Sequence, residues 1–111
     1  MGEKGARQTP EGAVAADAIV ADLRPLGPVT SKKMFGGHGI FCDGVLFGLI
    51  DSQGTVHLRA DDASSAGFAE HGSIKHSRMP YWTVPAGVLE SESELVSWAS
   101  QALAVARAAK R

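Results

Sequence analysis

Residues 39–50 carry the strongest local constraint on the fold, because two apolar runs flank the dipeptide Asp43-Gly44. Asp-Gly between strand-like runs is typical of a two-residue hairpin turn, whose residues adopt positive φ angles. A second turn signal follows at residues 52–54, and the extended pattern covers residues 31–60. This part of the chain is predicted to form three consecutive antiparallel strands.

Helical patterns occur at both ends of the chain. Thr9 and Pro10 provide an N-cap and a first-turn proline, and apolar residues then recur at helical spacing until the Pro/Gly cluster at residues 25–28. Near the other end, Ser91 and Glu94 match a capping box and precede a long apolar stripe. We expect an N-terminal and a C-terminal helix.

The segment between the strands and the last helix is predicted to mix both structures. Asp61 or Asp62 is expected to cap a short helix that ends at Gly72. Two extended segments should follow, at residues 73–78 and 81–85, because the residue before a proline avoids helical dihedral angles.

The resulting order is helix, three strands, helix, two strands, helix, which indicates an α+β fold. We expect two layers, with an antiparallel sheet and helices mainly on one face. The domain should occupy residues 10–111, after a flexible N-terminus at residues 1–9. In residues 45–50 both alternating faces are apolar, so we expect a second face that is covered either by the same chain or by another subunit, with a homodimer slightly favoured.

Composition excludes several classes of function. Eleven Lys and Arg against twelve Asp and Glu give a net charge of −1, so the whole domain offers no positive field to a polyanion. Cys42 is the only cysteine and cannot form an intramolecular disulfide. Neither a signal-peptide pattern nor an apolar run of about 20 residues occurs. We expect a cytoplasmic protein without a membrane segment.

Candidate chemical motifs are weak. The run Gly36-Gly37-His38-Gly39 could approach a phosphate, but a strand-like segment follows it where a phosphate loop needs a helix, so a bulge or tight bend is favoured. The four histidines and Cys42 lack metal-ligand spacing. A nucleophile with an obvious base partner is missing as well. We expect no catalytic residues, no metal and no cofactor.

The cluster Met79-Pro80-Tyr81-Trp82 has two interpretations. Large rigid side chains could anchor a protein partner. The other interpretation is a turn at the edge of the core, which we favour for at least two of the four residues because a small domain with few aromatic residues usually needs them inside.

Several of these segments together resemble the N-terminal domain of the TfoX/Sxy family of bacterial competence regulators. The resemblance covers residues 10–108, and its most specific element is the Met-Phe-Gly-Gly segment followed by the Asp-Gly hairpin. The residues that carry it, as fold signatures or as a possible surface site, are Met34, Phe35, Gly36, Gly37, Gly39, Asp43, Gly44, Arg59, Asp61, Met79, Pro80 and Tyr81.

The resemblance implies a fold similar to secretion-chaperone-like folds. Full-length family members act with the cyclic-AMP receptor protein at promoters and carry a second, helical domain, whereas this sequence ends at Arg111, so we expect a stand-alone domain. The expected function is that of a non-catalytic regulatory or adaptor domain that binds a protein partner.

Two alternative functions belong to other classes. A small-ligand or enzymatic domain would need a pocket that joins His38, His57 or Cys42 to another polar group. A direct DNA-binding regulator, which we consider unlikely for this domain alone, would need its basic residues to converge on one face: Lys32, Lys33, Arg59, Lys75 and Arg78.

Overall fold

The structure is a computed structural model that describes residues 10–34, 36–76 and 79–110. The N-terminus that we expected to be flexible, residues 1–9, lies outside this described part. In chain order the elements are α1 (Pro10–Asp22), the 3-10 helix η1 (Arg24–Leu26), β1 (Val29–Met34), β2 (Gly37–Cys42), β3 (Val45–Ile50), β4 (Val56–Arg59), α2 (Asp62–Glu70), β5 (Tyr81–Thr83), α3 (Ala86–Leu89) and α4 (Glu92–Lys110).

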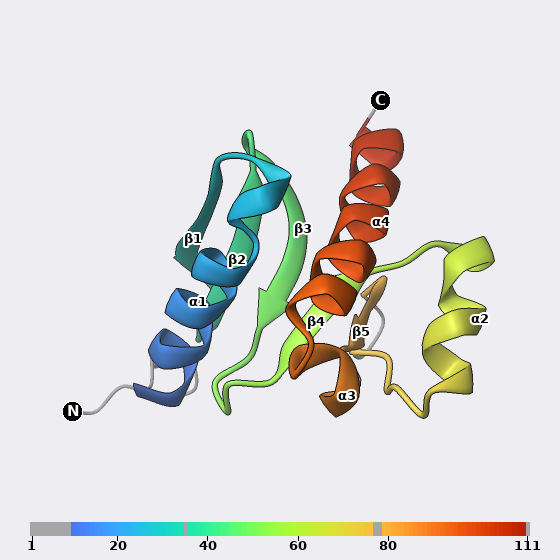
Figure 1. Ribbon diagram of the computed structural model, residues 1–111, viewed down its shortest axis with the longest axis horizontal. Helices are drawn as coiled ribbons and strands as arrows, with labels where there is room; N and C mark the ends of the chain where they lie inside the picture. The colour runs from blue at the N-terminus through green and yellow to red at the C-terminus, as the bar shows by residue number, and fades with distance from the viewer. Residues whose placement is uncertain (1–9, 35, 77–78, 111) are drawn as a thin grey trace.

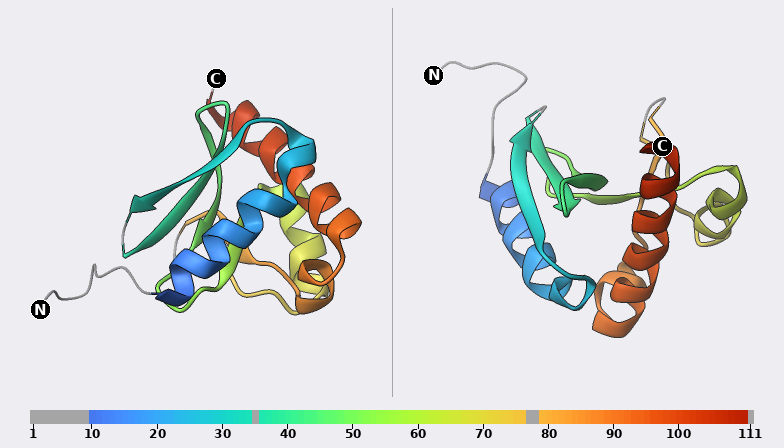
Figure 2. Two further views of the ribbon diagram at one scale, coloured as in Figure 1. Left: turned by 60° about the vertical axis from the view of Figure 1, so that its left-hand side comes forward. Right: turned by 90° about the horizontal axis from the view of Figure 1, so that it is seen from above.

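Within the described ranges, five strands form one antiparallel sheet in the order β1-β2-β3-β4-β5. The long helices α1 and α4 lie against the same face of this sheet, and α2 packs beside β5 at its edge (Figures 1 and 2). The expected two-layer α+β architecture is confirmed. No helix in the described ranges has the length and hydropathy needed to cross a membrane.

The strands are distributed differently from the prediction. Four strands rather than three precede α2, because a turn at Gly36, with φ of 77°, separates β1 from β2. The apolar residues before this glycine hid the turn signal in the sequence. After α2, the segment 73–76 contributes a single bridge between Lys75 and Trp82, and residues 77–78 lie outside the described ranges. The short helix α3 was not predicted.

The predicted turn and cap residues have the expected conformations. Asp43 and Gly44 adopt φ angles of 53° and 79°, as a two-residue hairpin turn requires. Asp61 caps α2, because its carboxylate accepts a hydrogen bond from the N–H of Ser64 at 2.8 Å while the Ser64 hydroxyl accepts one from the N–H of Asp61 at 3.0 Å. At the start of α4, the Ser91 hydroxyl accepts from the Glu94 N–H at 3.4 Å.

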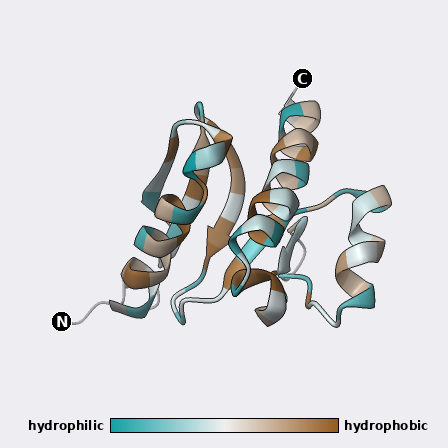
Figure 3. Cartoon of the chain, viewed as in Figure 1, coloured by the Kyte–Doolittle hydropathy of each residue, from teal (hydrophilic) through white to brown (hydrophobic). Residues whose placement is uncertain are grey.

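A β-bulge explains why β3 is apolar at every position. Ile40 of β2 pairs with Gly48, but Phe41 pairs with Leu46, so Phe47 is an extra residue in β3. The bulge shifts the alternation of side chains, so that Phe47 as well as Ile50 packs into the core beneath the helices. Figure 3 shows the resulting apolar stretch along β3.

The core lies between the sheet and the two long helices. Side chains from α1, from Leu23 directly after it and from α4 meet Ile40, Cys42 and Phe47 of the sheet, and Leu23 and Leu95 of α4 are fully buried. Cys42 is therefore a packing residue.

Candidate functional site

The face of the sheet opposite α1 and α4, here called the uncovered face, is apolar although no described helix packs on it. The strand pairings direct twelve residues toward it: Thr30, Lys32, Met34, Gly37, Gly39, Phe41, Leu46, Leu49, His57, Arg59, Tyr81 and Thr83. The apolar ones, Met34, Phe41, Leu46, Leu49 and Tyr81, are separate from the main core cluster.

Gly39 leaves a gap in this face that neighbouring side chains fill. A Cβ atom on Gly39 would collide with Sδ of Met34, and would lie 2.9 Å from Cδ1 of Leu46 and 3.1 Å from Cε1 of Phe41. The thioether of Met34 therefore lies over Gly39. An unbranched, polarizable methionine at this position can adapt its shape to a contacting surface.

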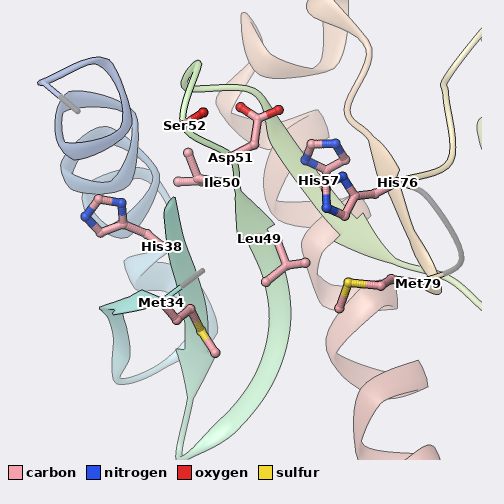
Figure 4. Close-up of a pocket in the computed structure, with 9 residues that line it drawn as sticks. All are labelled: Met34, His38, Leu49, Ile50, Asp51, Ser52, His57, His76 and Met79. Carbon is pink, nitrogen blue, oxygen red and sulfur yellow. The ribbon is translucent and has the colours of Figure 1, made fainter. Parts of the chain in front are cut away.

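A cavity of about 320 Å³ opens on the uncovered face. Leu49 lies between the thioethers of Met34 and Met79, and the rings of His57 and His76 stand at one side (Figure 4). Leu49 is only 7% exposed even though no described helix covers it, so side chains of the same chain form a partial roof. Its remaining lining residues are His38, Ile50, Asp51 and Ser52.

His57 and His76 form the polar side of this cavity. Their ring centroids are 4.8 Å apart in an edge-to-face arrangement, and Nδ1 of His57 lies 3.1 Å from the carbonyl oxygen of Thr55. Burial, together with the neighbouring His76, lowers the pKa of His57, while the nearby Asp51 carboxylate and the backbone carbonyls of Thr55 and Leu49 oppose the shift. His57 is thus held in its neutral form at neutral pH.

Asp51 is committed to the turn after β3. Its Oδ1 accepts hydrogen bonds from the N–H groups of Gln53 and Thr55, both at 2.9 Å. A carboxylate held in this way stabilises the turn and has less freedom to act as a general base.

The cavity has the composition that a small-ligand domain would need, because it joins His38 and His57 to His76 and Asp51. Cys42 lies outside it on the helix-covered face, where its Sγ is 4.0 Å from the carbonyl oxygen of Leu26. His38 lies on the same face as Cys42 by strand alternation, and Figure 4 shows its ring directed away from the His57–His76 pair. Its Nδ1 is buried without a hydrogen-bond partner among the described residues.

The structure brings together some of the residues singled out in the sequence. Met34 and Met79 line one cavity, and Arg59 pairs with Tyr81 across β4 and β5 with its guanidinium carbon 5.7 Å from the ring centroid. Pro80 lies between Met79 and Tyr81 in the chain, and its carbonyl oxygen accepts a hydrogen bond from the N–H of Ala60 at 3.0 Å.

The other predicted residues have structural roles at separate places. Asp43 and Gly44 form the β2–β3 turn, and Asp61 caps α2. Gly36 forms a turn and Gly37 lies in β2, where a Cβ would collide with the carbonyl oxygen of Ile50, so the glycine run is the tight bend that was favoured over a phosphate loop. Phe35 lies outside the described residues.

The aromatic cluster divides between the interior and the surface. Tyr81 is buried, and the partly buried Trp82 packs against the core cluster and near Phe68, with ring centroids 6.4 Å apart. Met79 is 36% exposed. The expectation that at least two of the four residues serve packing is confirmed.

The basic residues that a DNA-binding face would need do not converge. Lys32 and Arg59 point to the uncovered face, three strands apart, which corresponds to about 14 Å across the sheet. Lys33 pairs with His38 and Lys75 with Trp82, and both positions belong to the opposite face. Arg78 lies outside the described residues.

The sequence patterns pointed to His57 but did not place it beside Leu49 and His76. Leu49 pairs with His57 across β3 and β4, and this register is a property of the two strands together. One signal in the sequence was available: His57 and Arg59 are two residues apart in β4, and alternate residues of a strand lie on the same face.

Comparisons with known proteins identify the family. Residues 21–106, most of the chain, match the family model of the TfoX N-terminal domain. No curated protein matches the chain. The matched range contains the β2–β3 hairpin, the bulged strand β3 and all the strand positions of the uncovered face. The chain therefore belongs to the TfoX N-terminal domain family.

Proposed function

We propose that this protein is a non-catalytic regulatory or adaptor domain that binds another protein through its uncovered face. The observation that carries the proposal is the apolar lining of that face: Met34, Phe41 and Leu46 are only partly buried and Met79 is exposed. Of the described helices, α4 borders the face at the end near Arg59 through Ala106 and Ala109, and the middle of the face has no helix upon it. Contiguous apolar surface of this kind is typical of protein-interaction sites. Family membership supports a regulatory role, with transcription as the proposed process.

The chemistry of the face favours a protein over a nucleic acid. A DNA-binding surface needs several cations around a recognition element, whereas the uncovered face has two widely spaced cations, Lys32 and Arg59, among its strand positions. Methionine thioethers at its centre suit apolar side chains of variable shape.

A pair of charge insertions tests the proposal. Met34→Glu places a carboxylate on the uncovered face, and Val14→Glu places one on the outer surface of α1, where Val14 is 69% exposed. In affinity capture from the native cell, proteins retained by the wild type and by Val14→Glu should be lost with Met34→Glu. If all three baits, each folded by circular dichroism, retain the same proteins, the uncovered face is not the binding site.

The same face is available to a second copy of the chain, and we propose a homodimer through it. Sedimentation velocity at micromolar concentration should show a dimer for the wild type and a monomer for Met34→Glu. A wild type that sediments only as a monomer contradicts this part of the proposal, while a dimer that survives Met34→Glu places the interface elsewhere.

A further inference from the structure

A second cavity, of about 290 Å³, lies where β3 and β4 separate. The pairing between these strands ends at Gly48 and Leu58, so the earlier part of β3 and the end of β4 diverge (Figure 1). The walls of this cleft, here called the Arg59 cleft, come from the sheet, with α4 contributing small side chains. Its lining residues are Phe41, Gly44, Val45, Leu46, Arg59, Tyr81, Ala106 and Ala109.

Among the side chains that the structure describes, Arg59 is the only cationic one that lines the Arg59 cleft. It is half-buried and lies over the ring of Tyr81, which holds the guanidinium in place by a cation–π contact. Its Nε is buried and has no hydrogen-bond partner among the described residues. A buried donor without an acceptor is unfavourable, so this group favours a ligand that brings an oxygen atom.

The nearby carboxylates do not neutralise Arg59. Asp43 lies 3.9 Å from Arg107, and the Asp61 carboxylate is engaged by the N–H and hydroxyl of Ser64. Asp61 and Asp62 line a neighbouring cavity with Arg59, but no described carboxylate comes within the 4.0 Å of an ion pair. These carboxylates make the electrostatic potential near Arg59 more negative, which disfavours binding of a dianion such as a phosphate monoester more than binding of a monoanion.

We propose that the Arg59 cleft binds a carboxylate attached to an apolar chain. The planar guanidinium matches a carboxylate, and the side chains of Phe41, Leu46 and Tyr81 accommodate the apolar part. The carboxylate comes either from an acidic residue of a protein partner, in which case the inference rests on the proposed function, or from a free organic acid.

Hexanoate and its neutral isostere hexanamide are the first probes. In ¹H–¹⁵N NMR titrations of the full chain, hexanoate should bind in the millimolar range expected of a small ligand and shift the Arg59 Nε–H and the amides of Leu46 and Tyr81. Hexanamide should bind at least about tenfold more weakly, because it lacks the charge. Equal binding of the two compounds, or no shifts with hexanoate, overturns the proposal without requiring any variant.

Variants then test the role of Arg59. Arg59→Gln should weaken hexanoate binding by about tenfold or more, and Arg59→Lys should recover only part of the loss because it cannot form two parallel hydrogen bonds. Lys32→Gln removes an exposed cation from the same face of the sheet and should leave binding unchanged. If Lys32→Gln weakens hexanoate as much as Arg59→Gln does, the attraction is general and the cleft is not a specific site.

A peptide probe distinguishes a protein partner from a free organic acid as the source of the carboxylate. A capped Leu-Glu-Leu-Phe peptide should bind more tightly than hexanoate and lose this advantage when Gln replaces Glu, if the source is a protein partner. If hexanoate binds through Arg59 but the peptide does not, the site is supported and its source is a free organic acid. Because the affinity capture with Met34→Glu does not depend on Arg59, failure of the cleft and failure of the proposed function give different results.

Discussion

The two faces of the same sheet are both apolar, but they are buried by different means. On the helix-covered face, Ile40 and Phe47 are nearly inaccessible because α1 and α4 pack over them. On the uncovered face, Leu49 is buried beneath side chains from β1 and from the turn before β5, while Phe41 and Leu46 stay half-exposed. A helix layer completes a core, whereas a roof of a few flexible side chains leaves surface for a partner.

The difference between the faces also separates the roles of their polar groups. The described part of the helix-covered face has one buried imidazole, His38, with an unpartnered nitrogen. The uncovered face has the paired rings of His57 and His76 and the guanidinium of Arg59 at two distinct cavities. The cavities therefore bring His57, His76 and Arg59 together from the face that lacks a helix layer, while His38 reaches the first cavity from the other face of β2.

Adjacent residues of β3 give the largest expected contrast between the faces. Phe47→Ala should lower the free energy of unfolding by about 3–5 kcal/mol, the usual cost of removing a fully buried aromatic ring. Leu46→Ala, on the half-buried side, should cost about 1 kcal/mol. Urea denaturation measures both values, and equal losses would mean that the uncovered face is as much a core as the helix-covered one.

Two glycines of β2 provide the next comparison. Gly37→Ala places a Cβ against the backbone carbonyl of Ile50, which cannot move without distorting β3, so a loss of about 1–3 kcal/mol is expected. Gly39→Ala meets the flexible end of Met34 and should cost less. Thermal unfolding of the two variants tests this order, and a larger loss for Gly39→Ala would contradict the adaptable role of Met34.

The pH dependence of stability is a smaller effect, specific to the uncovered face. Because burial lowers the pKa of His57, the unfolded chain binds more protons than the folded one below the ordinary value of about 6.5. Stability should therefore be fully present above that pH and decline as the pH falls toward the lowered pKa.

A variant separates this contribution from those of other groups. His57→Gln should flatten the decline between neutral and mildly acidic pH, because it lacks the buried imidazole. Chemical denaturation at a series of pH values gives the comparison. An identical slope for the wild type and His57→Gln would exclude His57 as its source.

The smallest effect of a substitution is expected on the affinity for DNA. Because Lys32 and Arg59 lie three strands apart and Lys33 faces the opposite way, promoter DNA should bind no more tightly than the non-specific range of about 10⁻⁴ to 10⁻⁶ M near physiological salt. Replacing all three residues by Ala should change this little. Submicromolar binding that discriminates against scrambled DNA and is lost in the triple variant would instead identify a direct DNA-binding regulator.

Local signals in the sequence were sufficient for most individual elements. The Asp43-Gly44 turn, the Asp61 cap and the apolar stripe of α4 depend on interactions within a few residues, so their chemistry can be read from neighbouring positions. The turn at Gly36 was missed because the residues before it are apolar.

The two cavities depended on the tertiary structure. The bulge at Phe47 changes which residues of β3 face the helices, and a one-residue shift of this kind is set by pairing with β2 rather than by local propensity. The pairing of β3 with β4 brings Leu49 next to His57, and its early end opens the cleft beside Arg59. The sequence by itself determined most of the elements and the family. Only long-range strand pairing decided which side chains share a face, because register is a property of two strands together.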